Sequence, residues 1–329
     1  MAESEPDSLD TGWSRRRFLG TAAVVAGQAA WAAQRGRAGP VAGALGSRRS
    51  RVVKVRSDFV VRGHSVHDAL LMEMLESGLT SLTGAATATA AWHRLLRPSD
   101  VIGLKFNQSG QEIIGTTPAL ADALVRSLYD AGWPAGRVVC IEAPAEVTRR
   151  LETQPQAVGF EHEAVDFGSG RDRLARVLRQ VTALIDVPFI KTHNIAGMTC
   201  ALKNLSHGLI KHPARLHGNG CSPYIADIVA LPQIRNLVRL CVADGLRVAY
   251  DGGPDPGAET IADAGVLLLS TDLVAVESVA FSLLNDIRSD YNCDPVADNP
   301  RALGYLAKAA DRGLGTLAAH EIDLVDKAH

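Results

Sequence analysis

The stretch Val101-Ile-Gly-Leu-Lys-Phe-Asn107 is a short apolar run that turns polar at its end, and it decides the fold class. Thr117-Pro118 then opens a helical pattern that extends to Ala131, with the threonine as N-cap and the proline in the first turn. Arg137-Val-Val-Cys-Ile-Glu142 follows directly as a second strand. A strand, a helix and a strand in this order predict one unit of a largely parallel sheet.

The same alternation continues on both sides of this unit. Further strands are predicted at Arg51–Arg56, Leu184–Ile190, Asn236–Asp244 and Gly265–Ser270, and further helices at His67–Leu82, Thr89–Leu96 and Leu273–Leu284. A chain of 329 residues with 47% hydrophobic content can bury a sizeable core. We therefore expect an α/β fold with a largely parallel sheet, helices on both faces, and repeated strand–helix units.

The N-terminal residues have a different character. Ser14-Arg-Arg-Arg-Phe-Leu-Gly20 precedes a mildly apolar run at 21–33 that is too short and polar to span a bilayer, and it resembles a twin-arginine export signal. Cleavage after Ala30-Trp31-Ala32 or after Val41–Ala44 is possible, and a basic N-terminal tail is the alternative. The expected organisation is a signal segment at 1–33, a flexible linker at 34–50 and an α/β domain at 51–329.

These residues predict export by the twin-arginine machinery to a periplasmic or other extracytoplasmic location, with the protein anchored if the signal is retained. The net charge of −2 and the absence of a long basic run argue against a nucleic-acid partner.

The cysteines exclude two kinds of metal centre. There are five cysteines and no Cys-x-x-Cys pair, so neither a ferredoxin-type cluster nor a zinc ribbon is encoded. Cys140 and Cys241 lie in apolar strand-like runs and are predicted core residues. Cys200 and Cys221 are predicted as small buried residues, with disulfide pairing or metal ligation as the alternatives.

Cationic side chains are concentrated between Asp186 and His212. This segment holds three lysines and three histidines in a mostly apolar context, although only 21% of the chain is charged. Thr199, Lys203, His207 and Lys211 recur every four residues, which predicts one face of a helix. The alternative is a solvated basic stripe on that helix.

Polar residues also follow the predicted strands, where ligands bind in open α/β sheets. The residues concerned are Lys105, Asn107, Glu142, Lys191, His193, Asp244 and Asp272. We therefore predict one cleft at the carboxyl ends of the strands.

An anionic ligand is the first hypothesis for this cleft. Lysine ammonium groups and helix amides neutralise carboxylates and phosphates, which predicts substrate binding by Lys105, Asn107, Thr199, Lys203 and Asn204. The predicted catalytic residues are His193 as acid or base, Lys191, and Asp244, with Asp244 or Glu142 orienting the histidine.

A metal ion is the alternative ligand for this region of the chain. His207, His212, His217 and Cys221 are spaced by five, five and four residues, which is no standard ligand spacing. Lysines at 203 and 211 would repel a cation, so no metal ligand is predicted.

Several motifs together resemble the domain-of-unknown-function family 362 (DUF362), over residues 51 to 315. They are Val101–Asn107 with Thr117-Pro118, Pro188-Phe-Ile-Lys-Thr-His193, Gly197-Met-Thr-Cys-Ala-Leu-Lys-Asn204, His217, Asp244-Gly245 and Asp272-Leu-Val-Ala-Val-Glu277. The family's activity is not established, so the resemblance implies no catalytic residue. Some members carry a fused iron–sulfur module; this chain lacks its cysteine motif, so a redox role would need a partner protein. Glu277 stands where members often have Asp.

Two functions are consistent with these observations. The first is an exported enzyme that acts on a small carboxylate or phosphate substrate at the carboxyl edge of its sheet. The second is a non-catalytic ligand-binding or accessory protein of an extracytoplasmic iron–sulfur redox system. Turnover that depends on Lys191 and His193 would distinguish them. The sequence does not identify a cofactor.

Overall fold

The computed structural model describes residues 49–296 and 302–329. The predicted signal segment and all but the last two residues of the predicted linker lie outside these residues. Within the described part of the chain, no helix is both long enough and apolar enough to cross a bilayer.

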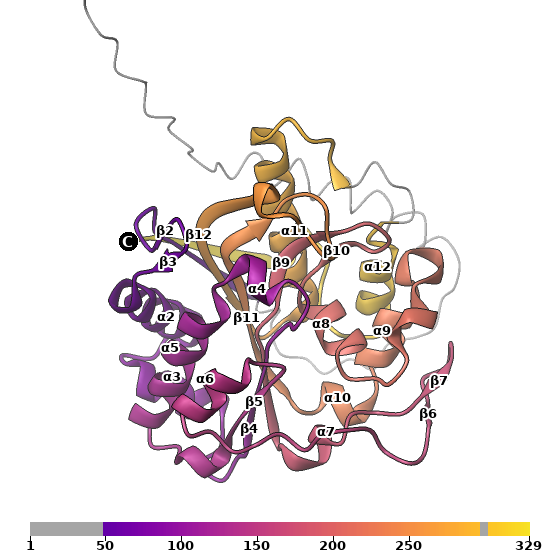
Figure 1. The fold of residues 1–329 in the computed structure, drawn as a ribbon, viewed down its shortest axis with the longest axis horizontal. Helices are drawn as coiled ribbons and strands as arrows, with labels where there is room; N and C mark the ends of the chain where they lie inside the picture. The colour runs from indigo at the N-terminus through magenta and orange to yellow at the C-terminus, as the bar shows by residue number, and fades with distance from the viewer. Residues whose placement is uncertain (1–48, 297–301) are drawn as a thin grey trace, which may run out of the picture.

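A nine-stranded sheet forms the centre of the molecule (Figure 1). Its strands run in the order β13, β1, β12, β11, β8, β4, β5, and β9 pairs with both β11 and β10. Their bounds are β1 Ser50–Arg56, β4 Ile102–Lys105, β5 Val138–Ile141, β8 Ala183–Asp186, β9 Phe189–His193, β10 Gly197–Thr199, β11 Val238–Ala249, β12 Ile261–Ser270 and β13 Ile322–Ala328. Two small hairpins add β2 (Val61–Arg62) with β3 (Ser65–Val66), and β6 (Val165–Asp166) with β7 (Arg171–Asp172).

Most of the sheet is parallel, which confirms the predicted α/β class. β4, β5, β8, β9 and β11 pair in parallel, as do β1 and β13, whereas β12 runs antiparallel to both β1 and β11. This orientation corrects one expectation. Asp272 follows β12 and therefore lies at the opposite edge from the carboxyl ends of β4, β5, β8 and β9, where it caps α11 and accepts a hydrogen bond from Ser50.

Helices cover both faces of the sheet, as predicted (Figure 1). One face carries α2 (Asp68–Thr83), α3 (Ala88–Leu95) and α5 (Thr117–Asp130), and the other carries α8 (Ala201–His207), α9 (Tyr224–Val229), α11 (Leu273–Asp290) and α12 (Gly304–Asp311). The short helices are α4 (Gln111–Ile114), α6 (Ala145–Arg150), α7 (Val177–Gln180) and α10 (Pro232–Arg235).

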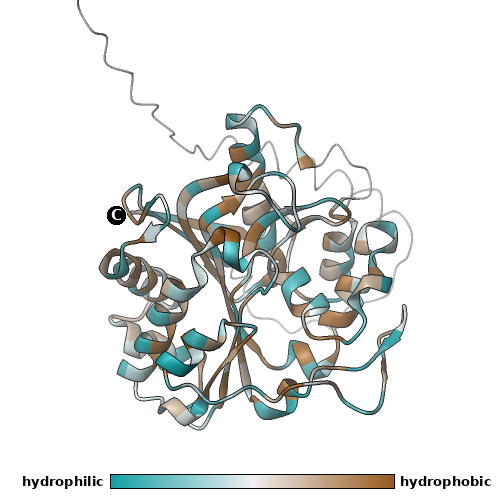
Figure 2. Cartoon of the chain, viewed as in Figure 1, coloured by the Kyte–Doolittle hydropathy of each residue, from teal (hydrophilic) through white to brown (hydrophobic). Residues whose placement is uncertain are grey.

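The core therefore has two layers, one on each side of the sheet. Leu240 and Val242 of β11 pack into one layer, and Cys241 and Ala243 pack into the other, because successive side chains of a strand point to opposite faces. Figure 2 shows the corresponding hydrophobic colouring of the central strands. Both predicted core cysteines, Cys140 and Cys241, are buried and free.

Two helices begin at other positions than predicted. The N-cap of α5 is Thr116, and Thr117 is already helical. The helix α8 begins at Ala201, so Thr199 belongs to β10, and the helix has ended before Lys211. The predicted four-residue stripe is therefore reduced to Lys203 and His207, which remain one helical turn apart.

Candidate active site

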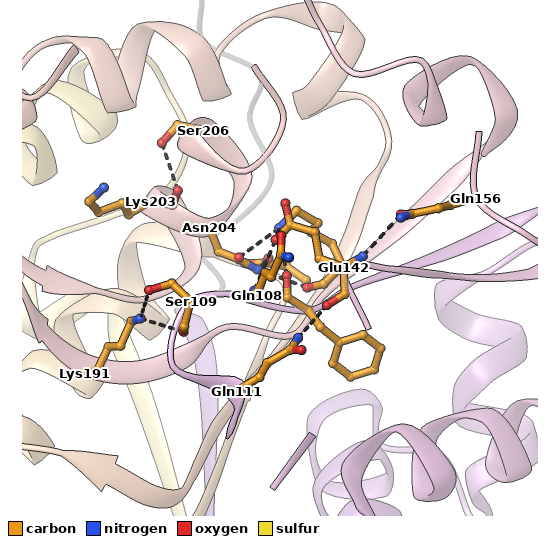
Figure 3. Close-up of polar contacts among 12 residues, drawn as sticks. Gln108, Ser109, Gln111, Glu142, Gln156, Lys191, Lys203, Asn204 and Ser206 are labelled. Atoms are coloured by element: carbon orange, nitrogen blue, oxygen red, sulfur yellow. Dashed lines mark hydrogen bonds and ion pairs between the residues drawn. The ribbon is translucent and has the colours of Figure 1, made fainter. Parts of the chain in front are cut away.

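Lys105 is a fully buried ammonium at the carboxyl end of β4, and all three of its hydrogens have acceptors. Its Nζ donates to the Phe106 carbonyl at 2.8 Å, to Glu142 Oε2 at 2.9 Å and to Asn204 Oδ1 at 3.0 Å. Figure 3 labels two of these acceptors, Glu142 and Asn204. An ammonium has three donors and no acceptor. Lys105 is therefore saturated by the protein itself.

Asn204 links this lysine to a buried acid. Its amide nitrogen donates to the Lys105 carbonyl at 3.0 Å and to Asp186 Oδ1 at 2.8 Å. Asp186 is fully buried, and burial raises the pKa of its carboxyl well above the usual value, against the effects of Asn204 and Lys105. We call Lys105, Glu142, Asp186 and Asn204 the Lys105 network.

Lys191 of β9 is also saturated, but by loops. Its Nζ donates to the Ser109 carbonyl at 2.7 Å, to Ser109 Oγ at 3.0 Å and to the Pro254 carbonyl at 2.8 Å. Burial lowers the pKa of Lys191 to about 8; Lys203 acts in the same direction and Asp255 in the opposite one. Lys191 therefore joins two loops at the carboxyl edge and has no donor left for a ligand in this arrangement.

His193 ends β9 as a buried neutral imidazole. Its Nδ1 accepts hydrogen bonds from the Ile195 and Ala196 amides at 3.1 and 3.2 Å. Burial, followed by the charge of Lys203, lowers its pKa to about 3. Because the two backbone amides already bond to Nδ1, neither Asp244 nor Glu142 orients His193 through a hydrogen bond at this atom, as had been expected.

Asp244 lies within β11, several residues before the end of that strand, and its carboxylate has other partners. Thr116 donates to Oδ2 at 2.6 Å and the Leu246 amide donates to Oδ1 at 3.1 Å. Burial raises its pKa to about 6. Asn107 and Thr199 are buried as well, and Thr199 lies opposite Lys191 in the β9–β10 pair.

Lys203 differs from the other two buried lysines. Its Nζ lies 3.3 Å from His217 Nε2, and within residues 49–296 and 302–329 no carboxylate oxygen lies in ion-pair range of it. His217 Nδ1 lies 3.1 Å from the Ala214 carbonyl, which can only accept, so Nε2 carries the lone pair that Lys203 needs. Burial lowers the pKa of Lys203 to about 8. Two of its three donors have no acceptor among the described residues.

Two more reactive side chains lie against Lys203. His207 is on the same face of α8, and its ring meets the His217 ring edge-on at 4.8 Å between centroids. Cys221 is buried and is the last residue of the turn Gly218–Cys221. Burial raises the pKa of the Cys221 thiol, against the effect of Lys203, and burial together with Lys203 lowers the pKa of His207 far below its usual range. We call Lys203, His207, His217 and Cys221 the His207 cluster.

The predicted residues therefore fall into separate groups. The ring of His193 stacks on that of His217 at 5.4 Å, so His193 borders the His207 cluster. His212 lies outside it, because its Nδ1 pairs with Asp172 at 3.0 Å. Lys105 and Asn204 belong to the Lys105 network.

Glu277 and Tyr305 support the site and were not predicted to do so. Glu277 is fully buried on α11, and it accepts hydrogen bonds from the Leu202 amide at 2.9 Å and from the Tyr305 hydroxyl at 2.7 Å. Burial raises its pKa to about 7. An acidic residue inside the apolar pattern of α11 was an available signal, whereas nothing in the sequence marks Tyr305.

A cleft of about 610 Å³ lies near the Ser109 loop, lined by Gln108, Gly110, Gln111, Glu112 and Asp255, among others. It does not include Lys191 or Lys203, and its acidic lining does not suit an anion. Neither lysine therefore lines this cleft.

Comparison with protein-family models gives one match. The model described as "Domain of unknown function (DUF362)" matches residues 102–282, which is more than half of the chain. A search of curated proteins found no match.

Proposed function

Because the chain belongs to the DUF362 family, whose description assigns no activity, we propose a function from the site itself. The protein binds a small carboxylate or phosphate at Lys203. The Lys203 ammonium would anchor the anion, and His193 would be the neighbouring acid or base. Of the residues predicted to bind the substrate, this proposal keeps Lys203 as the group that holds the anion.

The unmatched charge of Lys203 carries the proposal. A buried ammonium is costly unless it is paired, and in the part of the chain that the structure describes Lys203 has a single, neutral acceptor, His217 Nε2. An anion would supply both the missing charge and acceptors for its two remaining donors. Lys105 and Lys191, by contrast, have all of their donors in use.

Anion binding would also change the chemistry of His193. Burial, followed by the charge of Lys203, holds the pKa of His193 at about 3, so that it is a weak base at neutral pH. A bound anion would offset the charge of Lys203 and so move the pKa of His193 upward. In this proposal the ligand itself prepares His193 for proton transfer.

Calorimetric titration of metal-stripped protein with phosphate and with small carboxylates tests the binding. We expect Lys203→Met to weaken the bound anion by about tenfold or more, since a charge-assisted contact contributes about 1.5 to 3 kcal/mol. Lys211→Met is the matched control, because Lys211 is an exposed lysine in the same segment. Equal affinities for wild type and Lys203→Met would contradict the proposal.

The same anions separate the two functional hypotheses. If the protein is an enzyme, His193→Gln retains the bound anion and loses turnover of the true substrate. If the protein is an accessory protein of a redox system, wild type and His193→Gln bind the anion equally well and neither shows turnover. Direct turnover assays with phosphate esters and carboxylates make this comparison.

We also propose export by the twin-arginine machinery. The support is the Ser14–Gly20 motif, which lies outside the described residues. Replacing Arg15 and Arg16 with Lys should leave the protein in the cytoplasm on cell fractionation. Unchanged export of that variant would contradict the proposal.

A further inference from the structure

Three possible metal ligands meet beside Lys203. One donor atom each from His207, His217 and Cys221 lie within 4.8 Å of one another. His207 ends α8, His217 lies between the short turns Pro213–Leu216 and Gly218–Cys221, and Cys221 ends the second turn. Their spacing in the sequence gave no such indication, because the turns between them are irregular.

His207 presents an unused lone pair at this point. Ser206 Oγ donates to the Lys203 carbonyl at 3.2 Å, so the 3.0 Å contact between Ser206 Oγ and His207 Nδ1 has the histidine as donor. Nε2 of His207 therefore carries the lone pair. This atom is buried and has no hydrogen-bond partner among the described residues, and His207 as a whole is only 9% exposed. Such a buried, unpaired atom is costly and calls for an explanation.

His217 has the same tautomer. Its Nδ1 donates to the Ala214 carbonyl at 3.1 Å, and its Nε2 faces Lys203 at 3.3 Å. A ring nitrogen held by a backbone carbonyl is the usual way in which a protein orients a histidine for a metal. The two histidines thus offer two neutral nitrogen donors next to one thiol.

We propose that His207, His217 and Cys221 bind a divalent transition ion of the zinc type, which replaces Lys203 as the partner of His217. Two nitrogen donors and one sulfur donor suit Zn²⁺, and three protein ligands leave a fourth position open. Tetrahedral ligands lie about 3.3 to 3.8 Å apart, so the donors must approach by about 1 Å. His217 is only partly buried and lies between two short turns, so it can make this movement.

Binding exchanges protons and hydrogen bonds in a defined way. Cys221 releases its thiol proton to solvent and binds as the thiolate. His217 Nε2 gives up the hydrogen bond from Lys203 and donates its lone pair to the metal. The Lys203 ammonium then has to turn away, because two cations repel each other. Lys203 therefore opposes metal binding, and its removal should favour it.

This inference does not depend on anion binding. The anion is measured on metal-stripped protein, and the metal is measured in anion-free buffer, so either proposal can fail alone. Metal binding is read from the ion's own spectrum and requires no activity.

Cobalt(II) titration of the full chain tests the site, with Zn²⁺ competing for it. We expect the visible bands of tetrahedral cobalt and a thiolate-to-cobalt charge-transfer band in the near ultraviolet. Cys221→Ser should lose the charge-transfer band, and His207→Gln should weaken cobalt binding by at least about tenfold. Cys293→Ser and His212→Gln are the matched controls and should behave as wild type, because neither residue belongs to the cluster.

Lys203→Met gives the opposite result, an affinity for cobalt about tenfold higher than that of wild type. Far-ultraviolet circular dichroism and thermal melting confirm that each variant is folded, and Cys221→Ala repeats the test if the serine variant is not. The proposal is overturned if wild type shows no tetrahedral cobalt spectrum, or if the spectra of Cys221→Ser and His207→Gln match that of wild type.

Discussion

The Lys105 network and the His207 cluster both include residues of the short helix α8, and they differ in how far the hydrogen-bond donors of their lysines are satisfied. Asn204 of α8 is hydrogen-bonded to Lys105 and Asp186, and Lys105 is hydrogen-bonded to Glu142, all at 2.8 to 3.0 Å. Lys203, the preceding residue, has one neutral acceptor. Neighbouring residues of a helix point in different directions, so α8 separates a network around a saturated lysine from a lysine with unused donors.

The difference indicates which buried cation serves structure and which serves a ligand. A cation whose donors are all used by the protein can contribute to stability, and it gives a ligand nothing to bind. A buried cation with unused donors costs stability and is typical of functional sites. Burial alone would not have separated Lys105 from Lys203, since both are almost inaccessible.

The largest effect is expected for Lys105→Met, which breaks the satisfied side of the comparison. It leaves Glu142 and Asn204 without their shared donor, and removing one partner of a buried ion pair costs roughly 3 to 5 kcal/mol. Urea denaturation should show this loss in the free energy of unfolding. Lys203→Met should stay within about 1 kcal/mol of wild type, because it removes a buried charge that has no carboxylate partner among the described residues. Similar losses for the two variants would remove the distinction between the two sites.

A smaller effect, dependent on pH, is expected at the residue that holds α8 in place. Glu277 is fully buried and its pKa is raised from 4.5 to about 7, so the folded state keeps the proton longer than the unfolded state does. Stability from the protonated form is therefore present at low pH and is lost as the pH rises from about 4.5 through about 7, by up to about 3 kcal/mol.

Glu277→Gln should remove that slope while it keeps contacts to Leu202 and Tyr305. The measurement is the difference in unfolding free energy between variant and wild type from pH 4.5 to 8. This difference should rise with pH in favour of the variant. Glu73→Gln, an exposed position on α2, is the control and should give a flat difference. A flat difference for Glu277→Gln would show that its carboxyl does not titrate in this range.

The alternation of strands and helices was readable from the sequence, because period and turn residues are local signals. The direction of β12 was not, since an isolated apolar run such as Gly265–Ser270 is compatible with either orientation. That ambiguity is why Asp272 was expected at the wrong edge. Lys105, Lys191 and His193 were placed near the carboxyl edge because they follow strands that do run in parallel.

The distinction between Lys105 and Lys203 could not be predicted, because it depends on acceptors far away in the chain. Lys105 meets Asn204, 99 residues later, and Asp186 joins the network from a third strand. The gathering of His207, His217 and Cys221 had even less support in the sequence. Asn219, Gly220 and Cys221 all have positive φ angles, and the spacing of His207, His217 and Cys221 in the sequence does not predict the turn that these angles form.

The hydroxyl of Tyr305 makes a contact that a fragment limited to the matched residues would lose. The family match ends at residue 282, yet Tyr305 holds Glu277, and β1 with β13 covers the side of β12 away from β11. A fragment limited to residues 102–282 would leave β12 with an open edge of unpaired amides and carbonyls, and Glu277 without its hydroxyl donor. The matched range is thus narrower than the set of residues that pairs both edges of β12 and supplies the hydroxyl donor of Glu277.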